Sequence, residues 1–304
     1  MRIQDRAFIL LQYLLPQHAL TALIYALARI KTRWLKNALI RGFMALFPVD
    51  LSEALIPHID EYTTFNDFFT RALKPTARPI APDPYSIISP ADGTVSECGL
   101  IHGQTILQAQ LTAKNRTYTL SELLGDDAKA RHYIDGSFVT IYLAPHNYHR
   151  VHMPLTATLT EIKHIPGQLF SVNRVTAMAV PQLFARNERV VCHFLSSAGP
   201  CALVFVGALN VGSISIDGCG QITPSSNRKP NTIELPQNRS LNFSRGEQLG
   251  YFNMGSTVIV LMPRDQSTFD SHLVAGVNIN MGERIGALSP SGSHATCNAP
   301  FLRS

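Results

Sequence analysis

Apolar residues at the start of the chain fall into two runs, residues 7–15 and 19–28, which Pro16-Gln17-His18 separates. Each run is shorter than the roughly 20 apolar residues that a membrane-spanning helix needs. Residues 1–48 are therefore predicted to form amphipathic helices that lie on a membrane surface. Two other interpretations stay open, because arginines before an apolar run are also typical of a signal peptide, and short helices can simply cover a protein core.

The rest of the chain, residues 49–304, has the pattern of a β-rich catalytic domain. Prolines punctuate residues 50–90, where we expect short helical pieces and loops. Short β-prone segments follow, and strands are expected at 93–97, 105–111, 137–144, 156–164, 190–195, 202–206, 211–216 and 256–262. We further expect helices at 119–132 and 174–184, a surface loop at 222–246 and a last strand at 285–288. The predicted fold class is α+β, a mostly antiparallel β body with an N-terminal helical membrane-associating segment.

Positive charge is concentrated at the start of the chain. Residues 1–48 hold seven basic residues and one acidic residue, whereas the whole chain has a net charge of +5. A basic, apolar end on a nearly neutral body favours an anionic membrane surface as a partner. No recognisable nucleic-acid-binding motif accompanies these residues, so nucleic acid is not expected as a partner.

The cysteines suggest neither a disulfide framework nor a metal site. There are five, widely spaced and without a Cys-x-x-Cys pair: Cys98, Cys192, Cys201, Cys219 and Cys297. This usage is typical of a reducing cytoplasm. Together with the basic N-terminal segment, it predicts a peripheral location on the cytoplasmic face of the cell membrane.

Three stretches carry residue types that can activate a serine. Gly255-Ser256 stands directly before an apolar, β-branched run, Asp92 lies in Ser-Pro-Ala-Asp-Gly-Thr, and His149 and His152 lie in Tyr-His-Arg-Val-His-Met-Pro. A serine needs a general base to become a nucleophile, and a histidine base is commonly oriented by a carboxylate. The three stretches therefore predict a nucleophilic serine site.

The same stretches resemble the phosphatidylserine decarboxylase family, of the pyruvoyl-dependent bacterial type, in which a Leu-Gly-Ser-Thr motif cuts itself between Gly and Ser. Here the motif reads Met254-Gly255-Ser256-Thr257, and Met for Leu conserves volume and apolar character. The resemblance covers roughly residues 5–263. It also includes stretches at 64–71, 78–80, 166–173 and 184–190.

The resemblance implies a first stage in which the chain cleaves itself. Asp92 would orient His152, and His152 would take the proton of Ser256 so that its oxygen attacks the Gly255 carbonyl. Elimination and hydrolysis would then release ammonia and convert Ser256 into a pyruvoyl group, without any external cofactor. The products would be a β chain, 1–255, and an α chain, 256–304, which stay together as partners.

The resemblance also implies a second stage, the decarboxylation of phosphatidylserine to phosphatidylethanolamine and CO₂. The pyruvoyl group derived from Ser256 would form a Schiff base with the serine amine of the lipid and act as an electron sink. His149 would protonate the carbanion that forms when CO₂ leaves. Whether the protein is a homodimer stays open.

Alternatives of other classes remain at this point. A serine hydrolase could use Ser256, His152 and Asp92, although the Gly-x-Ser-x-Gly elbow is absent. A non-catalytic β module like biotinyl or lipoyl domains could begin at Asp92, although no Met-Lys hairpin tip is found. His146, His149 and His152 have a spacing that can bind metal on a helix, but the nearby prolines favour a turn, and no metal is expected.

Overall fold

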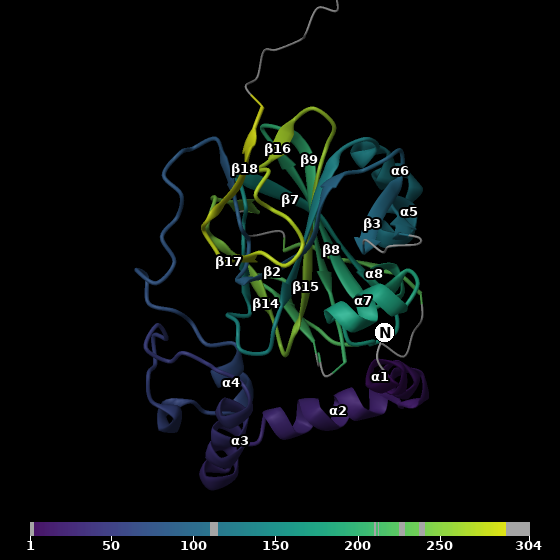
Figure 1. Ribbon diagram of the computed structural model, residues 1–304. Helices are drawn as coiled ribbons and strands as arrows, with labels where there is room; N and C mark the ends of the chain where they lie inside the picture. Colours follow the sequence, from purple (N-terminus) through teal and green to yellow (C-terminus); the bar gives the residue numbers. More distant parts are fainter. Residues whose placement is uncertain are drawn as a thin grey trace, which may run out of the picture.

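A computed structural model describes residues 3–109, 115–209, 211, 213–224, 229–236 and 241–289 of the chain. It has mixed α+β architecture, in which three N-terminal helices lie along one end of a body of antiparallel sheets (Figure 1). The predicted fold class is confirmed in its α+β character, its antiparallel sheets and its N-terminal helices.

The N-terminal helices are α1 (Ile3–Leu14), α2 (Gln17–Ala28) and α3 (Arg33–Leu46). Pro16 separates the first two, which are bent by 88° relative to each other. No single helix in the described residues is long and apolar enough to cross a membrane, although α1 and α2 pass that test as a bent pair. The predicted helical segment is confirmed.

A connector follows, made of the 3₁₀ turn η1 (Ile59–Glu61), the short helix α4 (Phe65–Phe69) and the strand β1 (Ser86–Ile88). Thr64 begins α4 through a capping box, in which its hydroxyl accepts from the Asp67 N–H and the Asp67 carboxylate accepts from the Thr64 N–H. The Phe side chains of α4 pack against α3, so this connector joins the N-terminal helices to the body.

The body is built around a nine-stranded antiparallel sheet with the order β12-β7-β8-β9-β15-β5-β2-β17, in which β13 also pairs with β7. Its strands are β2 (Gly93–Leu100), β5 (Ser137–Leu143), β7 (Ala157–Ile165), β8 (Arg189–Ser196), β9 (Gly199–Val206), β12 (Asn231–Ile233), β13 (Asn242–Phe243), β15 (Ser256–Met262) and β17 (Asn278–Ile279). Residues 257–262 of β15 are all buried between β9 and β5. The apolar run after Ser256 is therefore a central strand, as predicted.

Three smaller sheets complete the body, with orders β11-β10-β14-β6, β1-β18-β16 and β3-β4. Their strands, besides β1, are β3 (Thr105–Ala109), β4 (Arg116–Thr119), β6 (Arg150–His152), β10 (Ile214–Ile216), β11 (Gly220–Ile222), β14 (Gln248–Phe252), β16 (Ser267–Phe269) and β18 (Arg284–Leu288). β18 confirms the predicted last strand. The predicted loop at 222–246 is partly wrong, because β12 and β13 pair with β7 there; residues 225–228 and 237–240 of this loop lie outside the described residues.

Both helices predicted within the body are interrupted. The first divides into α5 (Leu120–Leu124), α6 (Asp127–Ala130) and η2 (Arg131–Tyr133), because Gly125 adopts φ +60° and ends α5. The second divides into α7 (Arg174–Ala179) and α8 (Leu183–Arg186), with Pro181 between them.

Candidate active site

Two chain segments that connect the four-stranded sheet to the nine-stranded sheet lie side by side. One runs from β5 to β6 through residues 144–149, and the other runs from β14 to β15 through residues 253–255. Ser256 is in register with Leu143 at one end, and the Phe252 N–H donates to the His149 carbonyl, at 3.1 Å, at the other. Pairing at both ends therefore holds the histidine loop against the Gly255-Ser256 step.

The backbone is strained directly before this step. Met254 has φ +90° and Gly255 has φ +25°. A positive φ suits glycine but is unfavourable for methionine, and such a residue typically stores about 1–3 kcal/mol. The Met254 side chain packs against the apolar cluster of α3 and α4, which fixes it in place. Strain is thus concentrated next to the predicted cleavage site.

His149 is a neutral, fully buried base. Its Nδ1 lies 2.9 Å from the Asn147 carbonyl oxygen, so Nδ1 carries the proton and Nε2 carries the lone pair. Nε2 is buried and has no hydrogen-bond partner among the described residues. Burial, with the nearby positive charge of Arg71, lowers the pKa of His149 to about 3. The ring lies 4.1 Å from that of Phe69.

His152 has both ring nitrogens occupied. Its Nδ1–H donates to the Gly246 carbonyl oxygen at 2.8 Å, and its Nε2 lies 2.9 Å from the Tyr148 hydroxyl, which must then be the donor. Burial lowers the pKa of His152, and the nearby Asp92 carboxylate opposes this shift. His152 is therefore also neutral near pH 7, but its lone pair is capped.

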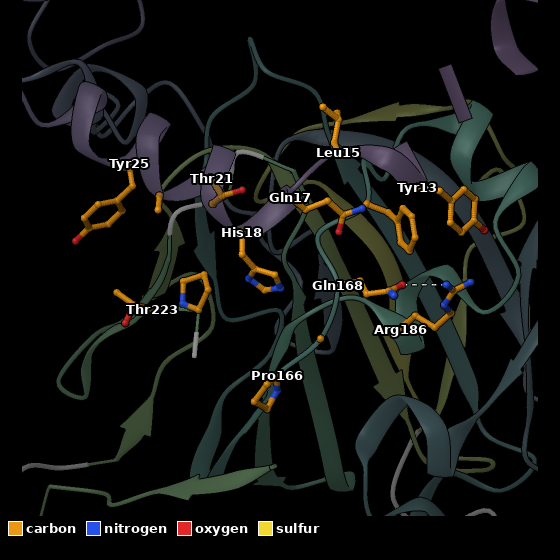
Figure 2. Close-up of a pocket in the computed structure, with 14 residues that line it drawn as sticks. Tyr13, Leu15, Gln17, His18, Thr21, Tyr25, Pro166, Gln168, Arg186 and Thr223 are labelled. Carbon is orange, nitrogen blue, oxygen red and sulfur yellow. Dashed lines mark hydrogen bonds between the residues drawn. The ribbon is translucent and has the colours of Figure 1, made fainter. Parts of the chain in front are cut away.

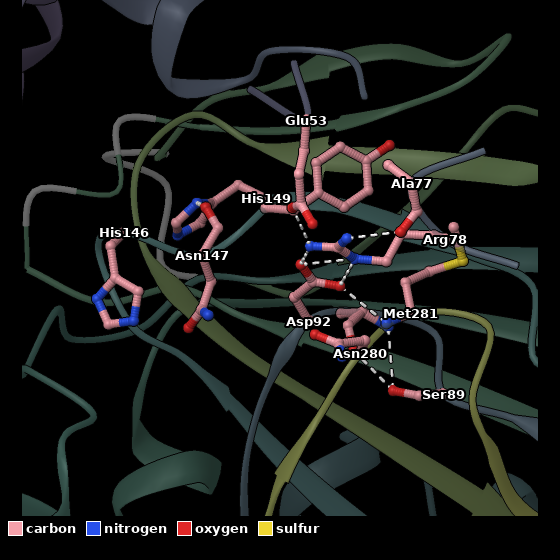
Figure 3. A network of polar contacts seen from close by, with 12 residues as sticks. Glu53, Ala77, Arg78, Ser89, Asp92, His146, Asn147, His149, Asn280 and Met281 are labelled. Atoms are coloured by element: carbon pink, nitrogen blue, oxygen red, sulfur yellow. Dashed lines mark hydrogen bonds and ion pairs between the residues drawn. The ribbon is translucent and has the colours of Figure 1, made fainter. Parts of the chain in front are cut away.

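Asp92 is buried, and its carboxylate is bound by Arg78 and by the backbone of Met281 (Figure 3). Its carboxylate accepts from Arg78 Nε at 2.9 Å and Nη2 at 2.6 Å, and from the Met281 N–H at 2.8 Å. Arg78 also binds Glu53, at 2.9 Å, and the pKa of Arg78 is raised mainly by its hydrogen bonds to Asp92. The expected pairing of Asp92 with His152 is not among the hydrogen bonds formed here. The turn carrying Asp92 nevertheless adjoins β6, because the His152 N–H donates to the Pro90 carbonyl at 2.7 Å.

Helix α4 and the residues directly after it contribute two functional candidates that were not predicted from the sequence, Asn66 and Arg71. Asn66 Nδ2 donates to Asn253 Oδ1 at 2.9 Å, just before the strained step, and Arg71 Nη2 donates to the His146 carbonyl at 3.0 Å. The Nε and Nη1 groups of Arg71 are buried and lack a partner within the described part of the chain. The sequence signal that could have identified them is the presence of polar Asn66 and Arg71 in a segment, residues 65–71, that is otherwise rich in phenylalanine.

A cavity of about 470 Å³ lies next to Arg71. Arg150 and Tyr251 also line it, and Arg150 is held there by the Thr70 carbonyl at 2.9 Å and the Gln248 side chain at 2.8 Å. Asp67 lines the cavity too, but its carboxylate accepts from the Thr64 N–H at 3.1 Å. Two guanidinium groups against one carboxylate favour an anionic ligand. Among the described residues, no group of three His, Cys, Asp or Glu side chains could hold a metal ion.

Comparison with known proteins shows the family to which the chain belongs. The family model described as phosphatidylserine decarboxylase matches residues 65–287, and a second model, described as PSD, matches residues 7–48. The chain belongs to the phosphatidylserine decarboxylase family. It is 48% identical to the phosphatidylserine decarboxylase proenzyme of Alkalilimnicola ehrlichii, over 88% of this chain and 93% of that protein. It is 45% identical to the proenzyme of Alcanivorax borkumensis, over 97% of this chain and 100% of that protein. It is 46% identical to the proenzyme of Pseudomonas fluorescens, over 93% of this chain and 98% of that protein.

Phosphatidylserine decarboxylase is a carbon–carbon lyase, and this family uses a pyruvoyl group derived from a serine by self-cleavage. The residues present fit that group. A Cβ atom placed on Gly255, next to Ser256, would meet no atom within 4 Å, so there is open space beside this step. In the adjoining loop, the buried Nε2 of His149 has no hydrogen-bond partner among the described residues. A hydrolase and a non-catalytic carrier module are thereby set aside as interpretations.

Proposed function

We propose that this chain is the precursor of a phosphatidylserine decarboxylase that cuts itself between Gly255 and Ser256, with Asp92, His149 and His152 as its working side chains. The observation that carries the proposal is the placement of the histidine loop against a strained Met254-Gly255 turn. A strained peptide favours rearrangement because the strain is lost when the bond is broken.

In the first stage, Ser256 Oγ attacks the Gly255 carbonyl carbon while His152 accepts the hydroxyl proton. The Gly255–Ser256 amide becomes an ester and the freed amine takes a proton. β-Elimination then breaks the ester, which leaves a carboxylate on Gly255 and dehydroalanine at 256. Hydrolysis of dehydroalanine consumes water, releases ammonia and leaves the pyruvoyl group.

β6 places His152 opposite Gln248, eight residues before Ser256, so the β14–β15 segment must move toward His152 before it can act in this way. Two hydrogen bonds must also change. The Tyr148 hydroxyl now caps Nε2, and Asp92 is bound by Arg78. Rotation of the Tyr148 hydroxyl frees the lone pair of His152. A shift of Asp92 toward the ring would stabilise the imidazolium that forms. The hydrogen bond from His152 to the Pro90 carbonyl keeps the two elements close enough for this exchange.

In the second stage, the pyruvoyl group supplies an electron sink for the carbon that loses CO₂. Arg71 and Arg150 bind the anionic headgroup in the 470 Å³ cavity, where Arg71 has unpaired N–H groups. The substrate carboxylate, placed near His149, raises the pKa of that ring and lets Nε2 take up a proton. His149 then returns this proton to the substrate carbon after CO₂ has left.

The N-terminal helices support a peripheral location on the cytoplasmic face of the membrane. Two polar contacts join α1 and α2 to the body, because Gln12 Oε1 accepts from the Ser171 N–H at 2.9 Å and Gln17 Oε1 accepts from the Leu169 N–H at 2.8 Å. The Tyr13 ring also packs against that of Phe170, with ring centres 4.9 Å apart. Many other large apolar side chains of these helices are exposed. On α1–α3 they are Ile3, Leu10, Leu11, Leu14, Leu23, Leu27, Trp34 and Leu46. An exposed apolar surface of this size indicates a membrane surface.

This location is tested by replacing Leu10, Leu14 and Leu23 with serine. The triple variant should lose most of its binding to vesicles of phosphatidylglycerol and phosphatidylcholine in a flotation assay, because these side chains carry the apolar contact. Self-cleavage should continue, since the three residues make no contact that the site needs. Undiminished flotation would refute the membrane surface.

Mass spectrometry of the purified protein tests the proposed cleavage. We expect two chains, residues 1–255 and residues 256–304, with the smaller one blocked at its N-terminus and lighter by the change from serine to pyruvoyl. Ser256→Ala should give a single chain of 304 residues. An intact wild-type chain that still releases CO₂ from phosphatidylserine would refute the mechanism.

A further inference from the structure

A second and larger cavity, of about 1120 Å³, lies between the α1–α2 elbow and the body (Figure 2). His18, Thr21 and Tyr25 of α2 form one wall, and Gln168 and Arg186 belong to the opposite wall. None of the described residues that line it is acidic. The mechanism proposed above uses no residue of this cavity.

Arg186 is the cation of the cavity and is held in a fixed orientation. Its Nη2 donates to Gln168 Oε1 at 2.9 Å, and its guanidinium lies 5.1 Å from the centre of the Phe170 ring and 5.9 Å from that of Tyr13. No carboxylate pairs with Arg186 in the described parts of the chain. A pre-oriented guanidinium with N–H groups to spare is suited to a phosphate oxygen.

The surroundings of the cavity indicate where such a phosphate comes from. Leu10 and Leu14 of α1 are exposed beside the elbow, on the surface proposed to meet the membrane. The lining itself combines polar groups with apolar ones such as Leu15 and Phe170. This combination matches a phospholipid, whose phosphate enters the cavity while its acyl chains continue along α1.

We propose that this cavity binds one anionic glycerophospholipid of the membrane, through Arg186, as an accessory ligand that fastens the α1–α2 elbow to the body. The lipid is not the substrate in its reacting position. None of the described residues that line this cavity belongs to the 144–149 loop, to residues 253–255 or to the cavity beside Arg71.

The test is calorimetric titration of the full-length, processed protein with dihexanoyl phosphatidylglycerol, a soluble phospholipid that lacks an amine. We expect one molecule to bind, and dihexanoyl phosphatidylcholine to bind more weakly. Arg186→Gln should weaken the binding of phosphatidylglycerol at least tenfold, because it removes the positive charge. Ala22→Trp, which places a ring in the cavity from an exposed helix position, should weaken it as well.

Arg131→Gln is the matched control, because Arg131 is exposed on η2 and does not line the cavity. It should bind phosphatidylglycerol as the wild type does. Arg186→Gln should also keep its self-cleavage, and its kcat and KM for short-chain phosphatidylserine should stay within twofold. Self-cleavage and kcat test the proposed catalytic site, whereas phosphatidylglycerol affinity and KM test the accessory site, so the two proposals can fail separately.

Two results would overturn the accessory site. One is unchanged phosphatidylglycerol affinity in both Arg186→Gln and Ala22→Trp, which would mean that Arg186 only fastens α1 through Tyr13 and Phe170. The other is competition between phosphatidylglycerol and phosphatidylserine together with a tenfold higher KM in Arg186→Gln, which would make the cavity part of the substrate site.

Discussion

One histidine of the proposed site, His149, lies in the turn before β6 and the other, His152, lies in β6 itself, and the two rings have different neighbours. His149 Nε2 is bare and enclosed by the 144–149 turn, α4 and the end of β14, whereas His152 Nε2 accepts from Tyr148. Both rings donate Nδ1–H to a backbone carbonyl, so each presents the same nitrogen to the site. The two rings differ in the partner of Nε2, which is absent among the described residues for His149 and is the Tyr148 hydroxyl for His152. This difference suggests that the two histidines have different chemical roles.

The largest effect should come from removing each ring in turn. His152→Ala should remain a single chain, because loss of a general base typically reduces a rate by about 10²–10⁴-fold. His149→Ala should still cut itself but release little CO₂, because its proton is needed only after cleavage.

A gel of the two variants beside a CO₂-release assay on phosphatidylserine measures both outcomes. Ser256→Ala serves as the uncut reference. If His149→Ala stays uncut while His152→Ala is processed, the bare Nε2 of His149 is the base for Ser256 and the two roles are reversed.

Sequence patterns identified these histidines but not their surroundings. β15 was predictable because an unbroken β-branched run indicates a buried strand, and β14 was missed because Gln-Leu-Gly-Tyr-Phe neither alternates nor forms such a run. Asp92 was found by its motif, yet its partner Arg78 stands 14 residues earlier in a segment read as a loop. Asn66 and Asn253 are 187 residues apart, so only the folded chain reveals their hydrogen bond.

A smaller effect should follow from Tyr148→Phe, which sharpens the comparison by removing the cap on His152 and leaving His149 untouched. The hydrogen bond from the Tyr148 hydroxyl contributes about 1 kcal/mol, so its loss should make self-cleavage about fivefold faster. The rate is followed by gel after synthesis of the precursor. CO₂ release per cleaved molecule should not change, and slower cleavage would show that the hydroxyl assists the base rather than blocking it.

The smallest effect concerns stability at acid pH, and it compares the two rings in one measurement. Burial lowers the folded-state pKa of His149 to about 3 and also lowers the pKa of His152, while an unfolded histidine titrates near 6.5. The unfolded chain therefore binds more protons between these values, so stability is complete above pH 6.5 and falls as the pH drops below it. For His149 this loss of stability can reach about 2 kcal/mol between pH 6.5 and pH 5.

Urea unfolding of the uncut Ser256→Ala precursor at pH 7, 6 and 5 measures this loss. Adding His149→Gln should remove its share of the pH dependence, because glutamine takes up no proton. Adding His152→Gln should remove less, since the shift of His152 is smaller and the Asp92 carboxylate favours its protonated form. If the free energy of unfolding depends equally on pH in the two variants, the Nε2 groups of His149 and His152 have the same environment, and the comparison between the rings fails.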